Sequence, residues 1–96
     1  MTMLTVTQAK YLDGYKVALQ FNDGRSGQAD LYDTLDRGVF KTLQDVSKFA
    51  KLHVDPELET LAWPTGQDLA PEYLYVQAFK HDSNLQDQFR RWGYCS

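Results

Sequence analysis

Residues 15–21 of the chain read YKVALQF, in which large apolar side chains alternate with polar or small ones. A period of two predicts a β-strand with one buried and one exposed face. The dipeptide Asp13-Gly14 precedes this strand and Asn22-Asp23-Gly24 follows it, and both favour tight hairpin turns. With strand-like segments at 3–12 and 25–31, the first third of the chain is predicted to be a three-stranded antiparallel meander.

The middle of the chain predicts short helices and a second pair of strands. Residues 39–51 carry apolar side chains at three-four spacing, which fits one helix or two short ones, with Asp45 as the cap of the second. Residues 52–55 and 58–63 are predicted to pair around a turn at Pro56. Asp68 is expected to cap a helix that runs to about Lys80, with Pro71 in its first turn.

The C-terminal segment has a helical pattern of its own. Ser83 and Gln86 match a capping box, and Gly93 fits the position just after the helix. An apolar face is formed by Leu85, Phe89 and Trp92. This face could dock on a partner, or it could pack back on its own sheet, because a small domain has little core. We therefore divide the chain into a single α+β domain at 1–80 and a short C-terminal helical extension at 81–96.

Composition disfavours several classes of function. Ten basic and thirteen acidic residues give a net charge of −3, which makes nucleic acid an unlikely partner for the chain as a whole. Cys95 is the single cysteine, so neither an internal disulfide nor a multi-cysteine zinc site is possible. The N-terminus resembles no signal peptide, and no apolar run is long enough for a membrane span. A cytoplasmic location without membrane contact is therefore expected.

Few side chains suggest catalysis. His53 and Asp55 would share one strand face and could form a general-base pair, but no nucleophile is marked beside them. Asp30, Asp33 and Asp36 recur every three residues, yet they lack the glycine and glutamate placement of a calcium loop. We expect no enzymatic activity, no metal site and no cofactor.

Four runs, taken in order, closely resemble a small bacterial family, domain of unknown function 2442. They are ADL at 29–31, GVF at 38–40, VDPE at 54–57 and LAWPTGQDLAPEYLY at 61–75. The resemblance covers roughly residues 4–75 and implies an α+β fold: a three-stranded antiparallel meander, a helix, a second hairpin and a helix. The family has no established activity. Its members are often encoded beside small toxin-like proteins, and some carry a helix-turn-helix domain.

The resemblance and the acidic charge together favour a non-enzymatic protein-binding module, antitoxin-like in that its partner would be a small toxin-like protein. Residues 83–93 offer one helix, fewer than a helix-turn-helix needs, so a DNA-binding autoregulator is the alternative and a small hydrolase the third choice. A Trp beside a rigid Pro is a good contact anchor, although strand end, turn and helix cap explain the same residues. The predicted partner-binding residues are Trp63, Pro64, Asp68, Glu72, Leu85, Phe89 and Trp92. Exposed strand edges could also pair with a second copy.

Overall fold

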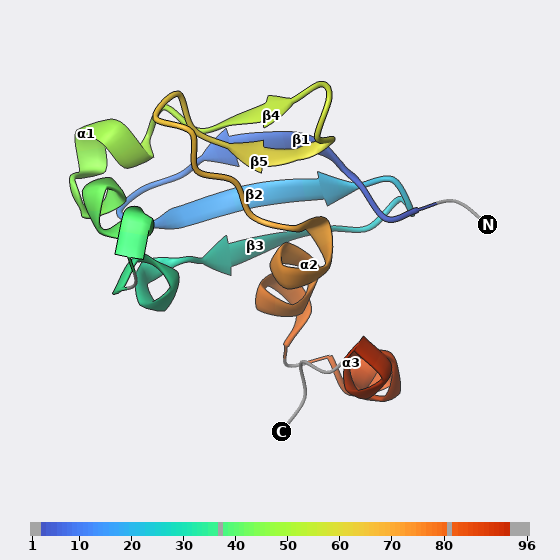
Figure 1. The fold of residues 1–96 in the computed structure, drawn as a ribbon. Helices are drawn as coiled ribbons and strands as arrows, with labels where there is room; N and C mark the ends of the chain where they lie inside the picture. Colours follow the sequence, from blue (N-terminus) through green and yellow to red (C-terminus); the bar gives the residue numbers. More distant parts are fainter. Residues whose placement is uncertain (1–2, 37, 81, 93–96) are drawn as a thin grey trace.

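A three-stranded antiparallel sheet forms the N-terminal third of the chain, in a computed structural model that describes residues 3–36, 38–80 and 82–92. Its strands are β1 (Val6–Tyr11), β2 (Lys16–Phe21) and β3 (Ser26–Asp30), in the order β1-β2-β3 (Figure 1). The predicted alternation is confirmed, because Val17, Leu19 and Phe21 of β2 are all buried. The meander and its two turns therefore form as the sequence predicts.

Three short helices follow at one end of this sheet. They are the 3-10 helices η1 (Tyr32–Asp36) and η2 (Gly38–Gln44) and the α-helix α1 (Val46–Phe49). The predicted cap is confirmed, since the Asp45 carboxylate accepts a hydrogen bond from the backbone N–H of Ser47. The alternative of two short helices over 39–51 is thus the one that the chain adopts.

A second hairpin and a longer helix complete the central part. The hairpin pairs β4 (His53–Asp55) with β5 (Thr60–Ala62), and α2 (Pro71–Phe79) follows. The predicted capping role of Asp68 is wrong, because α2 begins three residues later with Ala70 as its N-cap. Asp68 instead forms an isolated antiparallel bridge with Ala62. Pro71 disfavours helical backbone at the residue before it, so the chain stays extended up to Ala70.

The C-terminal segment forms η3 (Ser83–Leu85) and α3 (Gln86–Trp92). The predicted capping box is displaced by one residue: the carboxylate of Asp82 accepts from the backbone N–H of Asn84, at 2.9 Å. Gln86 still reaches back, and its Nε2 donates to the carbonyl oxygen of Asp82 at 3.1 Å. The side chain of Ser83, and the predicted helix stop at Gly93, lie outside what the structure describes.

One hydrophobic cluster joins these elements. Helix α2 packs against β3, and the second hairpin packs against β1. Leu85 and Phe89 are buried in the same cluster as the side chains of β2, so the C-terminal segment packs on its own chain. The fold is α+β, as predicted: a meander, short helices, a second hairpin, a helix and a C-terminal helix. Within the described ranges, no helix has the length and apolar character needed to cross a bilayer.

Candidate functional site

Trp63, the first of the predicted partner-binding residues, lies in the core. Its side chain is 2 % exposed, and its indole Nε1 donates to the carbonyl oxygen of Phe49 at 2.9 Å. Its ring also packs against the Phe49 ring, with centroids 5.7 Å apart. To contact a partner, Trp63 would have to leave the core and give up this bond. Its position therefore supports a structural role.

Pro64 and Asp68 lie on the surface in the turn that follows Trp63. The backbone N–H of Gly66 donates to the carbonyl oxygen of Trp63, which closes a tight turn with Pro64 in its second position. Gly66 has a φ of 101°, a left-handed value that glycine adopts without steric cost. The turn places Gln67 so that its side chain points back into the protein.

Gln67 fastens the turn to the short helices. It is buried, and its Nε2 donates to the carbonyl oxygen of Val39 at 2.8 Å. The indole of Trp63 holds α1 in the same way, through Phe49. The hydroxyl of Tyr15 likewise donates to the carbonyl oxygen of Gln44. Three side chains from the scaffold therefore hold the backbone of η2, α1 and the residues between them.

Helices η2 and α1, together with the neighbouring η1, carry exposed apolar side chains. Tyr32 on η1 is 65 % exposed, Val39 on η2 is 69 % exposed and Val46 on α1 is 41 % exposed. We call these three residues the apolar end. Helix η1 packs against η2 and η2 against α1, at the end of the sheet where the β1–β2 turn lies (Figure 1).

Val39 and Val46 are two of the apolar residues whose three-four spacing predicted helix over 39–51, and both are exposed. That spacing is the one that gives an α-helix a single apolar face. Helix η2 is a 3-10 helix, which has three residues per turn, so its side chains point in different directions from those of an α-helix. Leu43 and Phe49 of the same segment are buried as expected.

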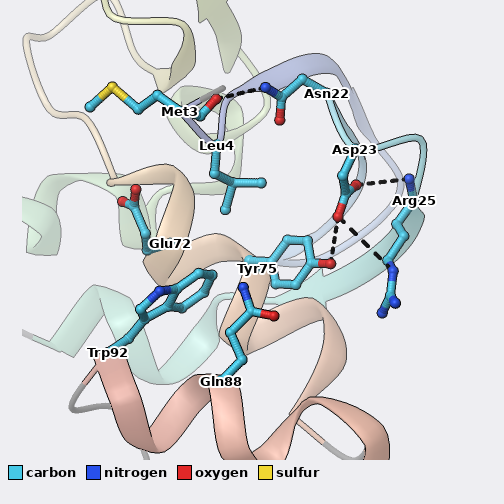
Figure 2. A pocket seen from close by; sticks show the side chains of 9 residues that line it. All are labelled: Met3, Leu4, Asn22, Asp23, Arg25, Glu72, Tyr75, Gln88 and Trp92. Atoms are coloured by element: carbon cyan, nitrogen blue, oxygen red, sulfur yellow. Dashed lines mark hydrogen bonds and ion pairs between the residues drawn. The ribbon is translucent and has the colours of Figure 1, made fainter. Parts of the chain in front are cut away.

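A second feature is a cleft at the other end of β2, where α3 meets α2 and the β2–β3 turn (Figure 2). Its volume is about 770 Å³. Two of the predicted partner-binding residues, Glu72 and Trp92, line it. The rest of the lining was not predicted from the sequence and consists of Met3, Leu4, Asn22, Asp23, Arg25, Tyr75 and Gln88.

Polar contacts organise one wall of this cleft. The Tyr75 hydroxyl donates to the Asp23 carboxylate at 2.6 Å, and the backbone N–H of Arg25 donates to the same carboxylate at 2.9 Å. The Arg25 guanidinium lies 4.0 Å from Asp23 and 3.9 Å from Asp82. Burial, and then the hydrogen bond to Asp23, raise the pKa of Tyr75 to about 12. The opposite charges of Asp23 and Arg25 thus lie close together in this wall.

His53 and Asp55, the predicted general-base pair, lie on β4, and the carboxylate of Asp55 is bound by the backbone of the turn that follows. His53 is exposed, while the Asp55 carboxylate accepts the backbone N–H groups of Leu58 and Glu57 at 3.0 and 2.8 Å. These two bonds, that of Leu58 first, lower the pKa of Asp55, to which His53 adds a smaller effect. The carboxylate thus shapes the β4–β5 turn. Among the described residues, no three His, Cys, Asp or Glu side chains gather closely enough to hold a metal ion.

Comparison with known proteins gives a family and a structural neighbour. The model of the family described as "Protein of unknown function (DUF2442)" matches residues 6–80. No curated protein matches the chain. A crystal structure of a "putative DNA binding protein" from Nitrosomonas europaea has a similar fold, with a TM-score of 0.75 and 15 % identity over 98 % of this chain. The match spans 63 % of that protein's chain.

Proposed function

Since this chain belongs to the DUF2442 family of proteins of unknown function, we propose that it is a non-enzymatic module that binds another protein through its apolar end. The observation that carries the proposal is the exposure of Tyr32, Val39 and Val46 on three helices that pack together. Exposed apolar side chains that gather on one part of a surface are typical of protein-binding sites. Tyr is also among the residues enriched at the energetic centres of interfaces.

The hydrogen bonds that the rest of the protein makes to the apolar end support this function. Hydrogen bonds from Trp63, Gln67 and Tyr15 hold the backbone that carries or adjoins it. A surface that is already ordered loses less conformational entropy when a partner binds. On this proposal, the Trp-Pro turn, which we predicted to touch the partner, instead holds the helices that carry the binding surface.

The charge of the chain favours a basic partner. The net charge is −3, so a basic protein would be attracted before contact and would associate faster at low salt. Small toxins that act on nucleic acid are often basic, because they must approach phosphate groups. We therefore propose, as the finer assignment, that the partner is a small toxin-like protein of positive charge.

An affinity capture with matched variants tests the proposal. The tagged chain is expressed in its own cell of origin, and captured proteins are identified by mass spectrometry. We expect one basic protein to be captured by the wild type, and its yield to fall at least about ten-fold with Tyr32→Ser and Val39→Ser combined, since interface hot spots contribute about 2 kcal/mol or more. The control combines Met3→Ser and Leu58→Ser, which also removes two exposed apolar side chains. Equal loss in both variants, or no reproducible partner, would contradict the proposal.

A second candidate function is DNA binding, which the description of the Nitrosomonas europaea protein favours. The basic residues that support this candidate are Lys80, Arg90 and Arg91, all exposed. The two arginines lie on α3, and Arg90 lies 3.1 Å from Asp87. A gel-shift titration with duplex DNA at low salt tests this candidate. If the chain binds DNA, its affinity should fall steeply as the salt concentration rises. For Arg90→Gln combined with Arg91→Gln, the plot of log affinity against log salt concentration should have a shallower slope. No shift at low salt would remove it.

A further inference from the structure

We propose that the cleft between α3, α2 and the β2–β3 turn binds an alkylammonium group, such as the end of a lysine side chain. The site lies at the end of β2 opposite to the apolar end, so the inference goes beyond the proposed function (Figure 1). It rests on the charge of the lining, on the aromatic wall and on the hydrogen-bonding state of the polar groups.

The charge of the lining calls for a cation. Asp23 and Arg25 are paired with one another, and Arg25 is shared with Asp82. Glu72 has no hydrogen bond or ion pair within the described ranges of the chain, so its carboxylate is the one charge of the lining without an ion-pair partner. The cleft therefore has a net negative charge, located at Glu72, which attracts a cation and repels an anion.

The walls fit the apolar stem of a lysine as well as its charge. Figure 2 shows Glu72, Leu4 and Trp92 on one side of the cleft and Asp23 and Arg25 on the other, with Tyr75 between them. The rings of Tyr75 and Trp92 lie with their centroids 5.9 Å apart. Methylene groups pack against such apolar walls, and an ammonium group is attracted to the face of a Trp ring.

Two of the polar side chains of the lining, Asn22 and Arg25, already have partners within the protein. The Asn22 amide donates to the carbonyl oxygen of Met3 at 2.6 Å and accepts from the backbone N–H of Thr5 at 3.0 Å. The guanidinium of Arg25 lies between two carboxylates. The carboxamide of Gln88 makes no hydrogen bond within the described ranges, and its oxygen is available to accept from an ammonium group.

The two tryptophans allow a direct test by NMR. The chain contains two Trp residues, so a ¹H–¹⁵N spectrum shows two indole N–H signals. Trp92 lines the cleft, whereas Trp63 is buried and bonded to Phe49, so it serves as an internal control. The wild-type chain is titrated with butylammonium chloride and with an acetylated and amidated Gly-Lys-Gly peptide. Butanol and the matching norleucine peptide are the neutral controls.

We expect either cationic probe to shift the Trp92 signal and to leave the Trp63 signal in place, with little effect from the neutral probes. Binding of butylammonium would show that the ammonium group suffices, and binding of the peptide alone would assign lysine within a peptide as the ligand. Glu72→Gln should weaken binding roughly three- to five-fold, as expected for loss of one partly exposed ion pair. Glu57→Gln, an exposed residue outside the cleft, should bind as the wild type does.

Three results would overturn the inference. They are the absence of any Trp92 shift with both cations, equal shifts with the neutral probes, and unchanged affinity in Glu72→Gln. The titration tests the cleft, and the capture experiment tests the apolar end. A negative result in the titration therefore leaves the proposed function standing, and a failed capture leaves the cleft proposal standing.

Discussion

Tyr75 is buried among aromatic rings while its hydroxyl donates to the Asp23 carboxylate, 52 positions earlier in the chain. The ring of Tyr75 meets those of Phe21 and Phe79 edge-on, at centroid distances of 4.9 and 4.7 Å. A phenolate ion at this position would be shielded from water and would be repelled by the negative charge of the Asp23 carboxylate. A single residue thus joins the core, helix α2 and the wall of the cleft.

This environment predicts a dependence of stability on alkaline pH. The pKa of Tyr75 is raised from its ordinary value of 10.0 to about 12, first by burial and then by Asp23. The folded chain therefore keeps a proton that the unfolded chain loses. The resulting stabilisation is complete below pH 10 and is lost as the pH rises through about 12.

An absorbance titration of the tyrosines, together with urea unfolding at several alkaline pH values, measures this effect. Compared with the wild type, Tyr75→Phe should lack the phenol whose pKa the fold raises, and its stability should fall less steeply above pH 10. Asp23→Asn should lower the pKa of Tyr75 in part, since burial remains. A Tyr75→Phe titration that matches the wild type at its alkaline end would refute this assignment.

At the scale of elements, the short helices depend on bonds from outside. Gln67 donates to the carbonyl oxygen of Val39 at 2.8 Å, and Trp63 donates to that of Phe49. Removing a donor leaves a carbonyl oxygen without its partner, which costs about 1–3 kcal/mol where water cannot replace it. Helices as short as η2 and α1 gain little stability from their own hydrogen bonds.

Gln67→Ala should therefore destabilise the chain by about 1–2 kcal/mol and speed hydrogen exchange in η2 and α1 more than in the sheet. Its control is Gln28→Ala, on the exposed face of β3, which should cost no more than about 0.5 kcal/mol. Urea unfolding and hydrogen exchange read by mass spectrometry measure both. Equal effects of the two substitutions would show that the bond to Val39 does not hold the helices.

The contact between α2 and β3 depends on a glycine. A Cβ atom built on Gly27 would lie 2.9 Å from Cε1 of Phe79, and the Phe79 ring is packed between Phe21 and Tyr75. Gly27→Ala should then cost about 1–3 kcal/mol through overpacking. In the Phe79→Leu background the same substitution should cost less, because the shorter side chain leaves room. A double-mutant cycle from urea unfolding measures this coupling, and additive costs would contradict it.

At the scale of the whole molecule, the C-terminal helix belongs to the same core as the sheet. Phe89 is buried, and its ring lies 6.4 Å from that of Tyr75 and 6.1 Å from that of Trp92. Phe89→Ala should lower the free energy of unfolding by about 3–5 kcal/mol, which is a large part of the total for a small domain. Arg90→Ala, on the exposed face of α3, is the control.

Thermal unfolding followed by circular dichroism distinguishes one cooperative unit from two. If 81–96 were an independent extension, Phe89→Ala would melt α3 early and leave the main transition in place. Packing into the shared cluster predicts that the main transition itself moves to lower temperature.

The local pattern was sufficient for the strands and turns of this chain, and for its assignment to the DUF2442 family. Alternation in YKVALQF and the flanking Asp-Gly and Asn-Asp-Gly turns act over a few residues, so their outcome depends little on the rest of the molecule. The cap at Asp45 is local for the same reason. Helix starts were less certain, because the extended backbone before Pro71 and the bridge at Asp68 involve another segment.

Tertiary packing decided which apolar residues are exposed and which polar residues meet. Nothing in the local pattern distinguishes Trp63, which is buried, from Val39, which is exposed, because the difference depends on the neighbours that the fold supplies. The cleft likewise combines the β2–β3 turn with α2 and α3, segments about 50 to 70 positions apart. Contacts at that separation form through the shared core, and a single sequence carries no periodic signal for them.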